Sequence, residues 1–178
     1  MKRWFLTILA LFSLSCRGEK YELGEMPIGI PAGTELVSQD GRRESLLQGN
    51  GATALFFGFT RCPDFCPMTL GKIDAAVKDG KLEQKLRLVF VSVDTPREKP
   101  EDLKRFLSSF PYARGFSGTK AEIAALEKSL GAFSKDDAGK ISHSLYIYVL
   151  NAKGKAVYLL RHDDPTAKIR AVLEQAAS

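Results

Sequence analysis

Residues 56–67 read FFGFTRCPDFCP, and this stretch decides the fold. It joins the apolar run at 52–59 to two cysteines that are separated by three residues and each followed by a proline. A nearly continuous apolar run is typical of a strand buried on both faces of a sheet. Proline disfavours helical angles in the preceding residue and is favoured at the first position of a helix. The stretch therefore predicts a buried strand, a loop over 62–66, and a helix that begins at Pro67 and is capped by Cys66.

The segments around this stretch predict a mixed α/β architecture. The expected elements, in chain order, are strands at 34–37, 42–47 and 52–59, a helix at 68–78, a strand at 86–93, helices at 100–110 and 119–130, strands at 145–150 and 156–160, and a helix at 165–176. The polar stretch at 131–142 is expected to be a loop. A buried strand that leads directly into the cysteines and then into a helix predicts a thioredoxin-like fold. It would be a mixed sheet flanked by helices, with an N-terminal β-hairpin and an inserted helix.

The N-terminal sequence MKRWFLTILALFSLSC predicts export from the cytoplasm. Two cations precede a short apolar segment at 4–15, which is the pattern of a secretory signal. A bilayer span needs about 20 apolar residues, so a permanent transmembrane helix is not expected. The cysteine after small residues resembles a bacterial lipobox. We expect a signal peptide over 1–16 that ends at a lipidated Cys16, a flexible tether over 17–30 and a domain over 31–178. Plain secretion is the alternative, because Ser13 stands where leucine is usual.

Composition agrees with a folded exported domain and gives no support to a nucleic-acid partner. The 178 residues are 44% hydrophobic and 26% charged, which is ordinary for a globular protein. The net charge is +5, but the sequence contains no basic run and no basic-aromatic stripe. We therefore expect no nucleic acid among the partners.

The spacing of Cys62 and Cys66 leaves three interpretations open: a disulfide staple, a redox pair or part of a metal site. A staple that closes so short a loop restrains little of the unfolded chain. Redox pairs of thioredoxin type have two intervening residues, whereas three are present here and open the loop for both sulfurs to face one ion. A cysteine at a helix N-terminus favours the thiolate, which both disulfide exchange and metal binding require.

His143 favours the metal interpretation. It lies in KISHSLYIYVL, at the start of a predicted core strand, and a thioredoxin-like fold places that segment beside the cysteine loop. A lone histidine at a strand start is more often a surface residue than a ligand, but the fold puts this one next to two thiols. Two sulfurs and one imidazole suit copper, whereas structural zinc sites have four protein ligands. The second histidine, His162, is expected to be solvated near the last helix.

Several blocks resemble the Sco/SenC family of copper-delivery proteins. FFGFTRCPDFCPMTL at 56–70 is similar to that family's G-Y-T-x-C-P-D-x-C-P signature. The blocks SVDTPREKPEDLKRF, GFSGT and ISHSLYIYVLNAKGK follow in family order and extend the resemblance to residue 155. Departures from the family pattern are Phe65, Thr95, Glu98 and Ser142. The last of these is the most telling, because the family usually has an aspartate before the histidine, and neighbours of a ligand tune its orientation and basicity.

The resemblance implies a copper chaperone. Such a protein binds one copper ion, as Cu(I) or Cu(II), through Cys62, Cys66 and His143. It delivers the ion to the dinuclear copper site of cytochrome c oxidase during assembly. Its expected partners are the copper-site subunit of the oxidase and an upstream copper donor. It would be anchored to the inner membrane of the bacterial cell envelope, facing outward.

Asp64 and Asp94 would either tune the site and dock a partner or serve only as a turn residue and a cap at the end of a strand. The alternative to a chaperone is an exported thiol–disulfide oxidoreductase that uses Cys62 and Cys66, with His143 lowering a thiol pKa. A peroxidase is disfavoured, because the domain has no spare thiol. We therefore expect a metallochaperone rather than a turnover enzyme.

Overall fold

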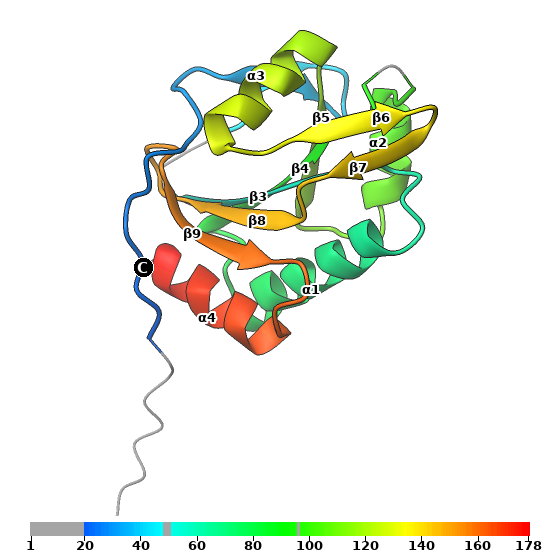
Figure 1. Ribbon diagram of the computed structural model, residues 1–178. Coiled ribbons are helices and arrows are strands. Elements are labelled where there is room, and N and C mark those ends of the chain that lie inside the picture. Colours follow the sequence, from blue (N-terminus) through cyan, green and yellow to red (C-terminus); the bar gives the residue numbers. More distant parts are fainter. Residues whose placement is uncertain (1–19, 48–50, 96) are drawn as a thin grey trace, which may run out of the picture.

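A seven-stranded mixed sheet forms the centre of the computed structural model, which describes residues 20–47, 51–95 and 97–178 (Figure 1). In spatial order its strands are β2 (Arg43–Ser45), β1 (Glu35–Ser38), β5 (Ala113–Ser117), β4 (Leu86–Ser92), β3 (Ala52–Gly58), β8 (Tyr146–Leu150) and β9 (Ala156–Arg161). The neighbours β3, β4 and β5 are parallel, and the other pairs are antiparallel. A separate hairpin consists of β6 (Ser134–Asp137) and β7 (Lys140–His143).

Four helices cover the two faces of this sheet (Figure 1). They are α1 (Phe65–Gly80), α2 (Pro100–Leu107), α3 (Lys120–Leu130) and α4 (Thr166–Ala176). The strand β3 alternates between two cores, because Ala54 and Phe56 pack with α1, α2 and α4, whereas Leu55 and Phe57 pack with α3. Burial on both faces explains its continuous apolar sequence. The predicted architecture, a mixed sheet flanked by helices with an N-terminal hairpin, is confirmed.

Three strands were not expected from the sequence. The strand β5 was not expected, because Arg114 and Gly115 interrupt its apolar pattern. The stretch at 131–142 was expected to be a loop, but most of it forms the β6–β7 hairpin. That hairpin lies outside the main sheet and most of its residues are exposed or half-buried, so it has no need of the apolar alternation by which strands are recognised.

The prediction of a flexible tether over 17–30 is wrong for residues 21–30. Their backbone bonds to the domain: Met26 N donates to Ala156 O at 2.8 Å, and Ile30 N donates to Gly154 O at 2.8 Å. The Ile30 side chain is buried. Apolar residues at nearly every second position let this extended segment pack on the core, a pattern that its polar average conceals. Cys16 and the signal segment lie outside the described residues, in which no helix is both long and apolar enough to cross a bilayer.

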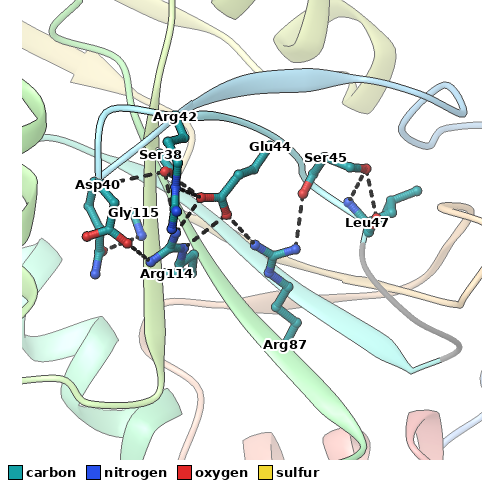
Figure 2. Close-up of polar contacts among 10 residues, drawn as sticks. Ser38, Asp40, Arg42, Glu44, Ser45, Leu47, Arg87, Arg114 and Gly115 are labelled. Atoms are coloured by element: carbon teal, nitrogen blue, oxygen red, sulfur yellow. Dashed lines mark hydrogen bonds and ion pairs between the residues drawn. The ribbon is translucent and has the colours of Figure 1, made fainter.

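Ion pairs fasten the β1–β2 hairpin to β4 and β5 (Figure 2). Arg114 on β5 contacts Glu44 at 2.5 Å and Asp40 at 2.6 Å. Arg87 on β4 donates to Ser45 O at 3.0 Å, and its guanidinium lies 5.1 Å from the centre of an aromatic ring on β5. Glu44 and Asp40 compensate the charge of Arg114, which explains how β5 accommodates an arginine near the core.

We expect Glu44→Gln to reduce the free energy of unfolding by about 1–2 kcal/mol, because Arg114 would lose its charged acceptor in a half-buried setting. The hydrogen bond from Arg114 holds the pKa of Glu44 below its usual value. The contribution is therefore present above the unfolded pKa and is lost as pH falls through the lower folded pKa. Urea denaturation at pH 7 measures the effect. Asp137→Asn, at a carboxylate that is 79% exposed, is the control, and equal losses in the two variants would contradict the prediction.

Candidate metal centre

The cysteine loop joins the carboxyl end of β3 to the first turn of α1. The strand ends at Gly58, Cys62 N donates to Phe59 O at 3.2 Å, and α1 begins at Phe65. Cys66 is therefore the second residue of the helix and not its cap, so the predicted start at Pro67 is two residues late. A proline is tolerated there because the first four N–H groups of a helix have no partner within the helix.

The structure brings Cys66 close to Cys62 on one side and to His143 on the other. The Cys66 amide nitrogen lies 3.5 Å from Cys62 Sγ, and Cys66 Sγ lies 3.9 Å from His143 Nε2. Cys66 is fully buried, Cys62 is half-buried, and both are free cysteines. In residues 20–47, 51–95 and 97–178, no group of three His, Cys, Asp or Glu side chains is yet gathered closely enough to hold a metal ion. A metal bound by all three would therefore need a small adjustment of the loop.

His143 is held in the form that binds metals. Its ring packs edge-on against Phe56 and Phe59, with centroid distances of 6.2 and 5.9 Å. Its Nδ1 lies 2.9 Å from Ser144 O, and because a carbonyl can only accept, Nδ1 carries the proton. Burial lowers the pKa of His143, so the ring is neutral and the lone pair of Nε2 faces Cys66. Imidazole binds metals in this neutral state.

The pKa of the Cys66 thiol is raised, whereas its place at a helix N-terminus was expected to lower it. Burial raises its pKa far above the ordinary value, although an interaction with the backbone of Phe59 acts in the opposite direction. The helix N-terminus does not offset removal from water, because desolvation of a charged group outweighs a partial charge. Cys66 is therefore a protonated thiol until something replaces its proton, and a soft metal ion can do so.

Gly58 makes room for this thiol. A Cβ atom at Gly58 would lie 2.9 Å from Cys66 Sγ and 2.6 Å from Cε2 of Phe90. No real side chain tolerates contacts of that length, so glycine is required for the sulfur to approach the end of β3. The Phe90 ring and the Cys66 sulfur both lie against Gly58, and only a residue without a side chain leaves room for the two.

Asp94 is a structural ion-pair residue rather than a metal donor. It is 2% exposed and accepts bonds of 2.6 Å from both Arg61 and Arg97. Arg97 continues to Asp136 on the β6–β7 hairpin, at 2.9 Å. The cysteine loop, the segment after β4 and the histidine-bearing hairpin are thereby joined in one chain of charges. Asp64, in contrast, is exposed and makes no side-chain hydrogen bond as the helix cap.

Glu98 ties the start of the cysteine loop to the end of β4 through hydrogen bonds. Its carboxylate is buried and accepts from Thr60, through both the amide and the hydroxyl, and from Ser92 Oγ at 2.6 Å. In the sequence, Glu98 stands out only as a departure from the family pattern, and nothing there predicts a role for Arg61 or Asp136. No local sequence signal marks these residues, because their partners lie on other segments of the chain.

The base of the histidine hairpin is closed by buried polar groups. Ser144 N donates to Phe133 O at 3.0 Å, and Phe133 N donates to Ser144 Oγ at 3.1 Å. Glu127 on α3 is 7% exposed and hydrogen-bonds to Ser134, but its Oε1 atom has no partner among the described residues. Burial raises the pKa of Glu127 despite those bonds. The hairpin is therefore attached to α3 by a carboxylate whose charge is only partly compensated.

Ser142 does not hold the His143 ring. It is exposed on β7, opposite Lys135 in the hairpin register, and the Nδ1 atom of His143 bonds to the main chain of Ser144 instead. The orientation of the imidazole is thus set by a backbone carbonyl, which does not depend on the side chain at position 142.

A model of the SCO1/SenC family matches residues 32–178. The chain belongs to the SCO1/SenC family. This SCO1/SenC chain is 32% identical over 152 residues to the mitochondrial SCO1 homolog 1 of Arabidopsis thaliana, with 79% of this chain and 45% of that protein covered. It is 32% identical over 132 residues to an SCO2-like protein of Rickettsia felis, covering 68% and 64%. The chain thus spans less than two thirds of the length of these relatives.

Solved structures of the family share this fold. Copper-bound ScoI of Bradyrhizobium japonicum matches with a TM-score of 0.73 and 32% identity, over 84% of this chain and 99% of that one. BsSco, a member of the Sco family of cytochrome c oxidase assembly proteins in which a disulfide switch has been identified, matches with a TM-score of 0.71 and 25% identity, over 87% and 96%. Homologous Sco structures therefore contain copper, and the predicted family and thioredoxin-like fold are confirmed.

We expect Gly58→Ala to destabilise the domain by about 1–3 kcal/mol, the usual cost of overpacking a core. The added methyl group would also push Cys66 Sγ away from β3. Chemical denaturation measures the first effect, and the rate of alkylation of Cys66 by a thiol reagent measures the second, which we expect to increase. Gly71→Ala in α1 is the control, because its nearest new contact would be an ordinary 3.9 Å. Unchanged alkylation in Gly58→Ala would contradict this account of the sulfur.

Glu127→Gln should change how stability depends on pH. Because burial raises the folded pKa of Glu127 above its unfolded value of 4.5, the folded state binds more protons between the two values. The contribution of Glu127 to the free energy of unfolding therefore falls as pH rises through that interval. We expect the variant to gain stability relative to the wild type between pH 4 and pH 7, measured by thermal unfolding at each pH. Parallel curves for the two proteins would show that the carboxylate remains solvated.

Proposed function

We propose that this protein is a copper chaperone. It binds one copper ion through Cys62, Cys66 and His143 and delivers it to the dinuclear copper site of cytochrome c oxidase during assembly. The observation that carries the proposal is the neutral His143 imidazole, whose Nε2 faces Cys66 Sγ at 3.9 Å beside a second free thiol. Copper-bound relatives support the choice of metal, and the membership of BsSco in a family of cytochrome c oxidase assembly proteins supports the choice of recipient.

The donor set selects copper on chemical grounds. Thiolate sulfur is a soft ligand that favours Cu(I), and imidazole is acceptable to both copper oxidation states. Each copper–sulfur bond replaces a thiol proton, so binding releases protons and strengthens as pH rises. The raised pKa of Cys66 increases this dependence. Three protein ligands leave a coordination position through which a recipient can begin the exchange.

The surface around the site suits a protein recipient. The large apolar side chains that are most exposed in the described part of the chain are Phe65, Met68, Phe133 and Tyr146, each about half exposed. Phe65 and Met68 flank Cys66 on α1, and the other two line a cavity together with His143. Exposed apolar groups that cluster around a reactive centre are typical of an interface. Cys62 is the more exposed thiol, so we expect it to meet the recipient first.

We further propose export and lipid anchoring at Cys16, on the basis of the signal-like sequence at 1–16. Residues 24–30 lie along the beginning of β9, at the end of the sheet where β3 also begins, whereas the cysteine loop follows the end of β3 (Figure 1). An anchor before this segment would place the copper site on the side of the domain that faces away from the membrane.

The second candidate is a thiol–disulfide oxidoreductase. The presence of two free cysteines in one short loop and the disulfide switch of BsSco favour it. The two functions overlap, since a recipient's cysteines must be reduced before they bind copper. They differ in the role of His143: as a ligand it determines copper affinity, whereas as a neighbour it only changes a thiol pKa.

A copper titration of the purified, anaerobically reduced protein tests the proposal. We expect one Cu(I) per chain. The His143→Ala variant should bind Cu(I) more than about 100-fold more weakly than the wild type. A loss of that size exceeds the effect of removing a residue that only hydrogen-bonds to a ligand. Competition with a chelator of known affinity gives both values, and Ser142→Ala is the neighbouring control, expected to bind as the wild type does. If His143→Ala binds as tightly as the wild type, the ligand assignment fails, and the reduction potential of the Cys62–Cys66 pair becomes the next measurement.

A further inference from the structure

The two histidines of this 178-residue chain line the same cavity. His143 and His162 border a space of about 290 Å³, together with Phe133, Tyr146 and Arg161 among others. The thiols do not line this space, but His143 links it to them, because its Nε2 atom lies 3.9 Å from Cys66 Sγ. His162 follows His143 by 19 residues and was expected to be an isolated, solvated residue. Two imidazoles beside one copper site are a donor pair that copper can use.

Strand pairing places His162 there. The strands β8 and β9 are antiparallel, with Tyr146 opposite Arg161, and His162 N donates to Leu145 O at 3.1 Å. Leu145 is two residues from His143, so the end of β9 lies beside the segment that carries the proposed ligand. Lys72 of α1 donates to His162 O at 3.2 Å, which attaches this turn to the cysteine-bearing helix.

The ring of His162 also contacts the cysteine segment. It packs edge-to-face on Phe65, with a centroid distance of 5.4 Å and an interplanar angle of 88°. Phe65 directly precedes Cys66. The ring nitrogens of His162 make no hydrogen bond within the described part of the chain. The side chain is half-buried, so it is held in place by an aromatic contact while its donor atoms remain available to solvent.

We propose that His162 is a receiving ligand, which binds copper at the surface and passes it to Cys62, Cys66 and His143. The inference rests on the proposed function. The transfer is a ligand exchange in which copper keeps its oxidation state. A copper–nitrogen bond to His162 forms as a bond to the donor's ligand breaks, and it breaks in turn as the bonds to His143 and the two sulfurs form. The two thiol protons pass to solvent.

Loading kinetics provide the first test. Cu(I) is supplied to the reduced protein as a coloured chelator complex, and loss of the colour is followed by stopped flow. We expect His162→Ala to load about ten-fold more slowly than the wild type, a barrier change of about 1.4 kcal/mol. Its equilibrium affinity should stay within about three-fold of the wild-type value, since the final ligands are intact. The His143→Ala variant should instead lose equilibrium affinity for copper. The two variants therefore separate the residue that receives copper from the residue that holds it in the final site.

His162→Phe is the matched control, because it keeps an aromatic ring against Phe65 and removes the nitrogens. Slow loading in both His162 variants supports a role of the His162 ring nitrogens as copper ligands. Slow loading in His162→Ala alone would overturn it and assign the residue to packing, and wild-type rates in both would overturn it as well. If the wild type binds no copper, the proposed function fails together with this inference. If the wild type binds copper tightly and His162→Ala loads normally, only the inference fails.

Ring NMR gives a readout that does not depend on loading. In a Cys62→Ser, Cys66→Ser protein both thiols are removed, and the two imidazoles that line the cavity remain as ligands for copper. We expect one equivalent of Cu(I) to shift the ring nitrogen signals of both His143 and His162. A shift confined to His143 would show that copper does not reach His162, and would overturn the proposal.

Discussion

The close approach of the Cys66 sulfur to the end of β3 is the constraint on which the rest of this site depends. Gly58 permits it, because a side chain at that position would collide with both Cys66 Sγ and the Phe90 ring, and His143 Nε2 lies 3.9 Å from the same sulfur. Because protein interiors are close-packed, a sulfur placed in this way cannot move far without moving its neighbours. Burial then determines its chemistry, since a thiol removed from water holds its proton until a metal or an oxidant replaces it.

Charged groups hold the three segments of the site together, and they do so from positions where charge is costly. Asp94 is almost fully buried and depends on two arginines, one from the cysteine loop and one that continues to the hairpin. Burying such groups stabilises a fold little compared with apolar packing, but it specifies which segments meet. Aromatic contacts of the His143 ring with Phe56 and Phe59 add to these ion pairs. Ion pairs also fasten the β1–β2 hairpin at Arg114 (Figure 2).

The same arrangement accounts for the overlap between copper delivery and thiol chemistry. Cys62 is reachable from solvent, Cys66 is sealed, and the imidazole beside them is neutral. Such a pair can give its protons to solvent and hold a soft ion, or can lose electrons and close a disulfide. Exposed apolar side chains lie around the pair, and a second imidazole, that of His162, lines a cavity together with His143.

The sequence by itself determined the family, through motif blocks that resemble its signature, and the order of most elements, because apolar runs and prolines are local signals. Its assignment of Cys62, Cys66 and His143 as ligands remains a prediction. It did not reveal β5, whose arginine is accommodated only by partners on the first hairpin, or the packing of residues 21–30. Tertiary structure alone decided the protonation of Cys66, the buried pairs around Asp94 and the position of His162. Each of these follows from distance and burial, which depend on residues far apart in the chain.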